Sequence, residues 1–466
     1  MSRRCARSSD WTRTRGQSPP DHGRSGVRLR VSSLEDRRFA VTARVPSFAS
    51  ALVVIATLGL VPGPAGAVER DGRPVAVLCK GEPATIVGTT GNDRLRGTAG
   101  KDVIVGLSGN DRIRALDGAD LLCGGEGKDR LFGGDGDDRL HGERDAVVGD
   151  RGGRVLVGDR LDGGLGNDHL DPGHDSRLGG SGGYQEVRFT SESVGVRVDL
   201  AAEPVTARGQ GEDVLVVLPG TRVVGSNVDD EFLGTEGRDD VTGMAGNDTA
   251  RLGGGADSWS DGSLRGESTV DDDVVDLGAG RDDAESFAGE DEIIGGFGGD
   301  TIWSGSLRPA AIDAGGGKDR LVATLTQAQG GSVDGGAGRD AVHFQRPDEQ
   351  DSTPLREEVE VPLVVIAVPA GTVETRWESG DVTQDVRAVE EFGVSDHVLL
   401  DFHGSDAAET LTGPSYNPLR AWLGGGDDVV QGGRRPDQVD GGDGQDEARA
   451  GPGRDTCVAV EIEHSC

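Results

Sequence analysis

The sequence predicts an all-β fold, a solenoid of short parallel strands with two irregular β inserts. Three observations support this prediction. The chain repeats a nine-residue unit, it contains 79 Gly among 466 residues, and each unit ends in a three-residue segment with one large aliphatic residue at its centre. Such a segment buries almost nothing alone, so the units must stack and bury their aliphatic residues in a column.

The repeat is clearest in residues 88–141, which divide without a gap into GTTGNDRLR, GTAGKDVIV, GLSGNDRIR, ALDGADLLC, GGEGKDRLF and GGDGDDRLH. Position four is always Gly, position six is always Asp, and position eight is always Leu or Ile. A flexible acidic linker, the simplest alternative, has no reason to place a large aliphatic residue two places after each Asp. The repeated position-four glycines are Gly91, Gly100, Gly109, Gly118, Gly127 and Gly136.

The net charge of the chain limits the classes of molecule that it can bind. There are 82 acidic and 48 basic residues, for a formal net charge of −34. So acidic a chain is repelled by nucleic acid and by anionic membrane surfaces, and it attracts cations. We therefore expect no nucleic-acid partner.

The spacing of the aspartates predicts a metal site. If two units make one turn of the coil, Asp93 stacks with Asp111, and Asp102 stacks with Asp120 on the opposite edge. Carboxylates about 5 Å apart repel each other by roughly 1 kcal/mol in water and by about 3–4 kcal/mol near a protein surface. A divalent cation between the turns reverses that sign. Carboxylate and carbonyl oxygens suit calcium, and position six, the expected ligand position, holds no sulfur residue that would favour zinc or copper.

Looser copies of the unit follow after interruptions, as far as residue 449. Gly allows the turn to bring backbone carbonyl oxygens to one point, and the position-six carboxylates lie beside them. We therefore expect several Ca²⁺ ions, with these candidate ligands: Asp93, Asp102, Asp111, Asp120, Asp129, Asp138, Asp168, Asp239, Asp248, Asp257, Asp282, Asp291, Asp300, Asp319, Asp340, Asp428, Asp437 and Asp446.

At these residues the sequence resembles the hemolysin-type calcium-binding repeats, or RTX repeats. The resemblance implies a right-handed parallel β-roll with calcium between its turns, secretion, and folding triggered by extracellular calcium. It also implies that the backbone of the six position-four glycines contributes ligands. The N-terminal leader is unusual for Gram-negative members, and the chain is more similar to secreted RTX-repeat proteins of actinobacteria.

The N-terminus and the cysteines predict export. The apolar run 48–61 followed by Ala65-Gly66-Ala67 is typical of a signal peptide, although a retained membrane anchor is an alternative. No stable membrane insertion is expected once residues 1–67 are removed. Four cysteines then remain, which allow three disulfide pairings. The favoured pairing joins Cys79 to Cys123 and Cys457 to Cys466, because each pair lies near one end of the chain.

The domain organisation follows from where the repeat stops. Two longer stretches lack it, share a similar order of strand-like segments, and are expected to form wider β-solenoid coils without calcium. The predicted segments are a leader (1–67), a first roll (68–181), an insert (182–224), a second roll (225–345), a second insert (346–412) and a C-terminal roll closed by cysteines (413–466).

No catalytic motif stands out from the repeats. The stretch HLDPGHD (169–175) could form a metal or acid–base site, but a solvent-facing turn is the preferred interpretation. The sequence therefore predicts a non-enzymatic calcium-binding protein with a structural or adhesive role, partnered by calcium and by a cell-surface or extracellular polymer. The alternative is an extracellular β-helix enzyme similar to polysaccharide lyases or epimerases.

Overall fold

The structure is a computed structural model, and its residues divide by their contacts into two units, Met1–Leu60 and Val61–Cys466. Every described residue lies in the second unit. The expected signal peptide therefore lies outside the described residues, apart from Ala67. The described ranges are 67–70, 73–143, 148–150, 153–155, 158–173, 185–190, 193–209, 211–218, 221–262, 271–305, 310–325, 330–346, 362–377 and 380–466.

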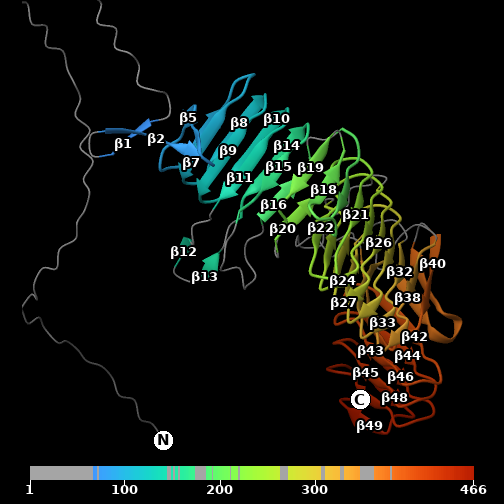
Figure 1. Cartoon of the computed structure of the whole chain (residues 1–466). Helices are drawn as coiled ribbons and strands as arrows, with labels where there is room; N and C mark the ends of the chain where they lie inside the picture. Colours follow the sequence, from blue (N-terminus) through green and yellow to red (C-terminus); the bar gives the residue numbers. More distant parts are fainter. Residues whose placement is uncertain are drawn as a thin grey trace, which may run out of the picture. The chain divides into compact units, whose positions relative to one another are not determined.

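Two long sheets of mostly parallel strands run along the coil (Figure 1). We call them sheet 1 and sheet 2. Sheet 1 consists, in spatial order, of β6 (Arg94–Arg96), β8 (Arg112–Asp117), β10 (Arg130–Asp135), β14 (Arg160–Leu165), β16 (Gln185–Arg188), β20 (Thr221–Val224), β22 (Asp240–Thr242), β25 (Ser258–Ser260), β28 (Asp283–Ser286), β31 (Thr301–Ser304), β34 (Arg320–Thr324), β37 (Ala341–Gln345), β41 (Glu391–Val394), β43 (Thr410–Thr412), β45 (Val429–Gln431), β47 (Glu447–Arg449) and β49 (Ile462–His464).

Sheet 2 takes the alternate units of the repeat. Its strands, in spatial order, are β5 (Ile86–Val87), β7 (Val103–Ser108), β9 (Leu121–Glu126), β11 (Arg139–Glu143), β15 (His169–Asp171), β19 (Glu212–Leu215), β18 (Val205–Arg208), β17 (Arg197–Asp199), β21 (Glu231–Leu233), β23 (Thr249–Arg251), β26 (Val274–Asp276), β29 (Glu292–Ile294), β32 (Ala311–Asp313), β35 (Ser332–Asp334), β40 (Gly380–Arg387), β39 (Thr372–Trp377), β38 (Leu363–Ala367), β42 (Leu399–His403), β44 (Leu419–Trp422), β46 (Gln438–Asp440) and β48 (Thr456–Val458).

The register of the strands is the one that the repeat predicts. Leu95 pairs with Ile113 in sheet 1, and Ile104 pairs with Leu122 in sheet 2, two units further along the chain in each case. The position-eight side chains of both sheets point inward and form one continuous hydrophobic core. The prediction of an all-β fold of stacked parallel strands is thus confirmed. The one helix among the described residues is a single 3-10 turn, η1 (Val368–Ala370).

Shorter elements complete the coil. A third parallel ladder follows the turns of the second roll, and it consists of β24 (Gly254–Gly255), β27 (Ala279–Gly280), β30 (Phe297–Gly298), β33 (Gly316–Gly317) and β36 (Ala337–Gly338). Three two-stranded antiparallel pairs are β1 (Ala67–Arg70) with β2 (Arg73–Ala76), β3 (Leu78–Cys79) with β4 (Glu82–Pro83), and β12 (Val148–Asp150) with β13 (Gly153–Val155).

The two inserts share one topology, and it differs from the expected one. Each adds an antiparallel meander to sheet 2, β17–β18–β19 in the first insert and β38–β39–β40 in the second. The last strand of each meander pairs with the coil before it, and the first strand pairs with the coil after it. The expected wider coils thus contain antiparallel strands, which the sequence analysis did not predict. Short loops that reverse the chain make antiparallel pairing the natural arrangement.

Both predicted disulfides are present, Cys79–Cys123 and Cys457–Cys466, each with a Cα–Cα distance of 5.8 Å. Cys79 and Ala84 pack on the outer face of sheet 2 against Val103, Val105 and Leu121, forming a second small core. The first bridge thus fastens the segment that covers one outer face of the first roll.

Candidate metal centres

The position-six carboxylates lie at the turns between the two sheets. Asp93, in the first unit, is half-buried. The other candidate ligands are all buried, although their side chains are ionisable: Asp102, Asp111, Asp120, Asp129, Asp138, Asp168, Asp239, Asp248, Asp257, Asp282, Asp291, Asp300, Asp319, Asp340, Asp428, Asp437 and Asp446.

One oxygen of each stacked carboxylate is used to join successive turns. The Asp93 N–H donates to Asp111 Oδ1 at 2.8 Å, and the Asp111 N–H donates to Asp129 Oδ1 at 2.7 Å. On the opposite edge the Asp102 N–H donates to Asp120 Oδ1 at 2.7 Å, and the Asp120 N–H donates to Asp138 Oδ1 at 2.8 Å. The structure therefore brings the candidate ligands together in the two columns that the sequence predicts.

The second oxygen, Oδ2, is left without a donor in many turns. A buried acceptor without a hydrogen bond costs about 1–3 kcal/mol, and more when it is charged. Among the described residues, Oδ2 is buried and unpaired in Asp111, Asp120, Asp138, Asp168, Asp248, Asp257, Asp282, Asp300, Asp319, Asp340, Asp428 and Asp446.

Burial makes the carboxylic acids of Asp138, Asp168 and Asp248 weaker when no metal is bound, because it raises their pKa. Burial is the first cause and repulsion from neighbouring carboxylates adds to it, so the pKa of Asp138 rises to about 7 and that of Asp168 to about 8. The pKa of Asp248 rises to about 7 for the same reasons. Each group must therefore take up a proton or meet a cation near neutral pH.

In several open turns a backbone carbonyl oxygen borders the same space as the unpaired Oδ2. A Cβ atom on Gly106 would lie 2.3 Å from Asp111 Oδ2 and 2.4 Å from the carbonyl oxygen of Gly124, the position-one residue of the next turn. A Cβ on Gly133 would likewise lie 2.2 Å from Asp138 Oδ2 and 2.4 Å from the Gly163 carbonyl oxygen. Two acceptors face one space with no donor between them, which is a ligand set for a hard cation.

Some turns with the same arrangement supply hydrogen-bond donors to Oδ2 themselves, because a threonine stands at position two. In the Asp102 turn, the N–H and the Oγ1 of Thr98 both donate to Asp102 Oδ2, at 2.7 and 2.9 Å. Thr235 makes the same pair of bonds to Asp239 Oδ2, at 2.7 and 3.0 Å. Thr89 does so with Asp93, at 2.6 and 2.9 Å. We call these closed turns, and those with an unpaired Oδ2 open turns.

The backbone of position two explains the difference. In open turns this residue has a positive φ, +87° at Leu116 and +126° at Gly134, whereas Thr98 and Thr235 are not in that region. The left-handed conformation costs a non-Gly residue about 1–2 kcal/mol, which explains why most repeats place a second Gly here. When the residue at position two has a positive φ, the carboxylate of the same turn therefore lacks the two donors that Thr98 supplies to Asp102.

The position-four glycines pack against each other from turn to turn. Gly127 and Gly136 have φ values of +127° and +134°, and a Cβ on either would lie 2.0 or 1.8 Å from the carbonyl oxygen of Gly109 or Gly118. These glycines are thus required by both backbone conformation and close approach. Carbonyl oxygens of position-one residues, rather than theirs, border the free Oδ2 atoms, and the ligand role of position four stays a prediction.

Several carboxylates continue the columns although the sequence analysis missed them. The Asp129 N–H donates to Asp159 Oδ1 at 2.7 Å, and the Asp248 N–H donates to Asp273 Oδ1 at 2.9 Å. Their units lack the glycines, but each residue stands two places before a buried aliphatic or aromatic residue, a signal that would have found them. The same signal would have found Asp213 and Asp230.

The comparison with protein families agrees with this geometry. A family model described as the RTX calcium-binding nonapeptide repeat (4 copies) matches residues 87–122, 114–148, 158–173, 224–258 and 422–457. The chain carries RTX calcium-binding nonapeptide repeats. No curated protein matches the chain. The stacked carboxylates extend beyond the matched RTX segments, since the Asp282 N–H donates to Asp300 Oδ1 and the Asp300 N–H to Asp319 Oδ1.

The donor set of the RTX turns fits calcium. Within the described ranges, no three His, Cys, Asp or Glu side chains gather into a cluster that could hold a metal ion. The candidate oxygen ligands of the described turns are the carboxylate oxygens of stacked turns and the backbone carbonyl oxygens beside them. That oxygen-rich set suits Ca²⁺ and lacks the nitrogen and sulfur ligands of zinc sites.

Within the HLDPGHD stretch, His169 and Asp171 lie in strand β15 and are half-buried. His141 Nδ1 lies 3.3 Å from Asp171 Oδ2, on neighbouring strands of sheet 2, and this hydrogen bond is the main reason why the pKa of Asp171 is lowered. Burial lowers the pKa of His169, whose ring lies 5.9 Å from that of His141. His174 lies outside the described residues.

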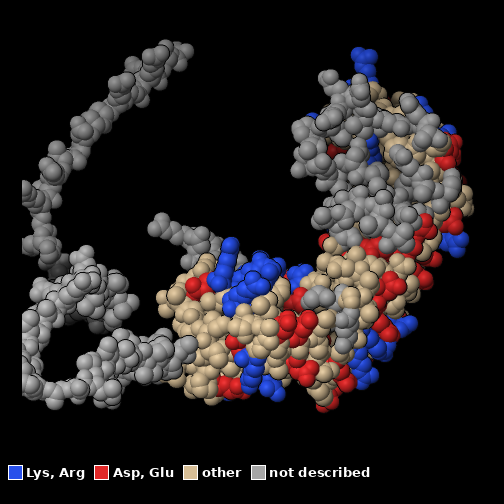
Figure 2. Space-filling model, turned by 90° about the horizontal axis from the view of Figure 1, so that it is seen from above, with Lys and Arg blue, Asp and Glu red and all other residues tan. Residues whose placement is uncertain are grey.

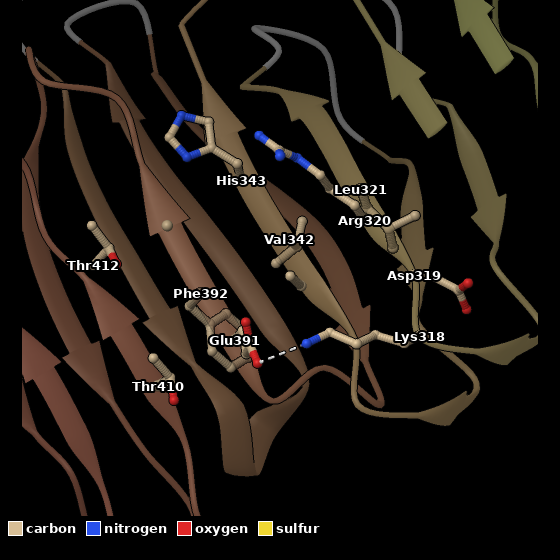
Figure 3. Close-up of a pocket in the computed structure, with 12 residues that line it drawn as sticks. Lys318, Asp319, Arg320, Leu321, Val342, His343, Glu391, Phe392, Thr410 and Thr412 are labelled. Atoms are coloured by element: carbon tan, nitrogen blue, oxygen red, sulfur yellow. Dashed lines mark ion pairs between the residues drawn. The ribbon is translucent and has the colours of Figure 1, made fainter. Parts of the chain in front are cut away.

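A pocket lies on the outer face of sheet 1, over β34, β37, β41 and β43, and Asp319 of a carboxylate column lies at its edge (Figure 3). Its volume is about 420 Å³, and His343 and Arg320 stand beside it. Gly393 leaves the hollow, because a Cβ there would lie 2.8 Å from His343 Nδ1. Glu391 is held by Lys318 at 3.8 Å and by Arg339 at 2.8 Å.

Proposed function

We propose that this chain is a secreted, non-enzymatic structural protein whose RTX rolls fold when Ca²⁺ binds between their open turns. The observation that carries the proposal is the buried, unpaired Oδ2 that shares one space with a carbonyl oxygen, as at Asp138 and Gly163. Without a cation, a row of such sites opposes folding through desolvation and repulsion. With calcium, each site contributes binding free energy that only the folded chain can gain.

The proposal divides the candidate ligands by the type of their turn. The open-turn carboxylates should carry calcium, with Asp129 as a member of the same column. The closed-turn carboxylates Asp93, Asp102 and Asp239 should instead be held by their threonines. In two further turns a protein group also reaches the carboxylate, since the Ser286 hydroxyl donates to Asp291 Oδ2 and the Gly433 N–H donates to Asp437 Oδ2 at 2.9 Å.

Export of the chain is supported by its cysteines and by its calcium chemistry. Two disulfides persist in oxidising surroundings such as the outside of a cell. Extracellular calcium near the millimolar range can fill even weak sites. Within the described residues, no helix is long and apolar enough to cross a membrane. The apolar run 48–61, which we propose to be a signal peptide, lies outside them.

A calcium titration followed by far-ultraviolet circular dichroism tests the proposal. The full chain, first stripped of metal with a chelator, should gain β signal as calcium is added, while magnesium at the same concentration should have little effect. Magnesium is the appropriate control because it demands a smaller octahedral site and gives up its water reluctantly. A chain that is β-rich without metal and unchanged by calcium would contradict the proposal.

The pocket of Figure 3 supports a second candidate function, an enzyme that acts on acidic polysaccharides. Arg320 and Lys318 could neutralise a sugar carboxylate, and His343 could accept a proton, beside a hollow on a parallel sheet. Incubation with polygalacturonate would test it, because a β-elimination creates an ultraviolet-absorbing double bond. Product formation that is lost in His343→Ala would establish this activity, and its absence would leave the structural role.

A further inference from the structure

Arginines are stacked on the outer face of sheet 1 in the first roll. One column consists of the position-seven residues of alternate units. In it Arg94 pairs with Arg112, Arg112 with Arg130, and Arg130 with Arg160. Position nine adds Arg96 and Arg114, which pair with each other. We call these six residues the arginine ladder. The ladder is unexpected in a chain whose formal net charge is −34.

The ladder is poorly neutralised by the protein itself. Among the described residues, Arg160 pairs with Glu186 at 2.7 Å, and no ion pair is found for the other five members. Arg112 and Arg114 each lie 5.3 Å from the centre of the Phe132 ring, which stacks beside them without supplying a negative charge. Like charges directly opposite each other on neighbouring strands destabilise a sheet. The fold alone therefore gives no reason for this column.

The two outer faces of the first roll differ in the residues they carry and in whether the chain covers them. On sheet 2 the corresponding positions hold apolar residues such as Val103 and Leu121, which Cys79 and Ala84 cover. On sheet 1 they hold the ladder, and a groove of about 470 Å³ lies between Arg94, Arg96, Arg112 and Arg114. Figure 2 shows Lys and Arg side chains gathered in a patch over this roll. One face is thus closed by the chain, and the other is open and cationic.

We propose that the arginine ladder binds a linear anionic polysaccharide that lies along the stacking direction of sheet 1. Guanidinium groups bind carboxylate and sulfate groups bidentately, and both occur on such glycans. Neighbouring rungs are about 4.8 Å apart, so one glycan chain can meet several rungs at once. The Phe132 ring holds two of the guanidinium groups in place, which reduces the entropy that binding must remove.

A narrow polymer fits better than a duplex nucleic acid or a membrane. Asp117 and Asp135, both exposed, pair with each other at the far end of the same strands and form an acidic margin beside the ladder. A wide anionic surface that reached the arginines would also approach this margin and the rest of an acidic molecule. A single glycan chain can remain within the cationic strip.

The test uses the full chain at saturating calcium and measures binding of polygalacturonate, a carboxylated polymer, by calorimetry. Arg94→Gln/Arg112→Gln/Arg114→Gln removes three of the six guanidinium groups of the ladder. A matched control, Arg238→Gln/Arg251→Gln/Arg281→Gln, removes the same charge from exposed arginines of the second roll. Neutral dextran, duplex DNA and phosphatidylserine vesicles serve as comparison ligands.

We expect the ladder variant to lose on the order of ten-fold in affinity for polygalacturonate, and the control variant to bind as the parent does. Affinity should fall as salt is raised, and dextran should not bind. Equal binding by both variants would overturn the proposal, because binding would then not depend on the ladder. Calcium ions that bridge the polymer to acidic side chains would explain such a result. Tighter binding of DNA or vesicles than of polygalacturonate would overturn it as well.

The ladder rests on the proposed function in one respect, since its register exists only in the folded roll. Circular dichroism of each variant with calcium separates the two ideas. A variant that folds with calcium and yet binds polygalacturonate like the parent contradicts the ladder alone. A parent chain that does not respond to calcium contradicts the proposed function, whatever it binds.

Discussion

The Asp102 and Asp138 turns lie in one column of the same roll, yet their aspartate side chains differ in hydrogen bonding. Asp102 Oδ2 receives two hydrogen bonds from Thr98, whereas Asp138 Oδ2 is buried and unpaired. Position two is the difference: Thr98 donates to the carboxylate in the first turn, whereas Gly134 is left-handed in the second. One residue thus separates a turn in which the protein supplies donors to Oδ2 from a turn in which Oδ2 has no donor.

The closed turns stand where each roll begins. Thr89 and Thr98 belong to the first two units of the chain, and Thr235 lies just after the first insert. Ser226, in the unit before Thr235, donates to Asp230 in the same way, and Ser405 donates to Glu409 after the second insert. A first coil that closes without metal gives the following open turns a template on which to stack. This lowers the nucleation cost that a repeat fold must overcome.

The largest expected effect comes from removing the charge of one open turn. Asp138→Asn should stabilise the calcium-free chain by about 1–3 kcal/mol, because the amide can donate to the carbonyl oxygen that borders Oδ2. It should also lower the calcium affinity of that site about ten-fold, about 1.4 kcal/mol, because a charged ligand is lost, so calcium should add less stability to the variant than to the parent. Circular dichroism with and without calcium measures both changes.

The matched variant for this prediction is Asp102→Asn, in the same column but in a closed turn. It keeps an acceptor for Thr98, so calcium should add as much stability to this variant as to the parent. Equal losses of this calcium-dependent stability in the two variants would contradict the distinction between open and closed turns.

The pH dependence of the calcium-free chain comes next in size. The folded chain raises the pKa of Asp138, Asp168 and Asp248 to about 7 or 8, from an ordinary value of 3.8. Between these limits the folded chain holds protons that the unfolded chain has released, so stability falls as pH rises. The metal-free chain should therefore melt at a higher temperature at pH 5 than at pH 8, by a thermal scan.

The control for the pH effect is the double variant Asp138→Asn/Asp168→Asn. It should flatten the pH dependence, which distinguishes these two carboxyls from the general repulsion of an acidic chain. A metal-free parent that is more stable at pH 8 than at pH 5 would show that these carboxyls do not carry raised pKa values.

A closed turn should respond to its hydroxyl rather than to calcium. Thr98→Val removes one of the two donors to Asp102 Oδ2 and should cost about 1–2 kcal/mol. The loss should be the same with and without calcium, as measured by urea denaturation. A loss that appears only when calcium is present would mean that this turn binds the ion too.

The smallest expected effect concerns backbone strain in an open turn. Leu116 has a φ of +87°, so Leu116→Gly should stabilise the calcium-bound chain by about 1 kcal/mol. Thr98→Gly, at a position without positive φ, is the matched control and should destabilise the chain. Urea denaturation at saturating calcium compares the two variants. If Leu116→Gly destabilised the chain and Thr98→Gly stabilised it, the proposed role of position two would be wrong.

The nine-residue pattern was enough to predict the stacking of the strands. The two-unit register, the inward column of Leu95 and Ile113, and the burial of the position-six aspartates all follow from a period with one aliphatic residue per unit. The two disulfides followed from the placement of the cysteines at the two ends of the repeats.

Other features depend on contacts that a linear pattern does not contain. The antiparallel meanders of the inserts form because distant strands of sheet 2 flank them. Asp159 and Asp273 lie in units without the position-four glycine, so the full nine-residue pattern does not mark them, although the aliphatic residue two places later does. The role of position two appears only when the φ of Leu116 is compared with the hydrogen bonds of Thr98, since Thr and Leu at that position look equally permissible in the repeat.

The most direct test of the central claim is a crystal structure of the chain grown with calcium, in which anomalous scattering locates the ions. The account predicts ions beside the Oδ2 atoms of open turns, such as those of Asp111, Asp120 and Asp138, and none within the closed turns of Asp93 and Asp102. Ions spread equally over both kinds of turn, or open turns that hold no ion at saturating calcium, would contradict it.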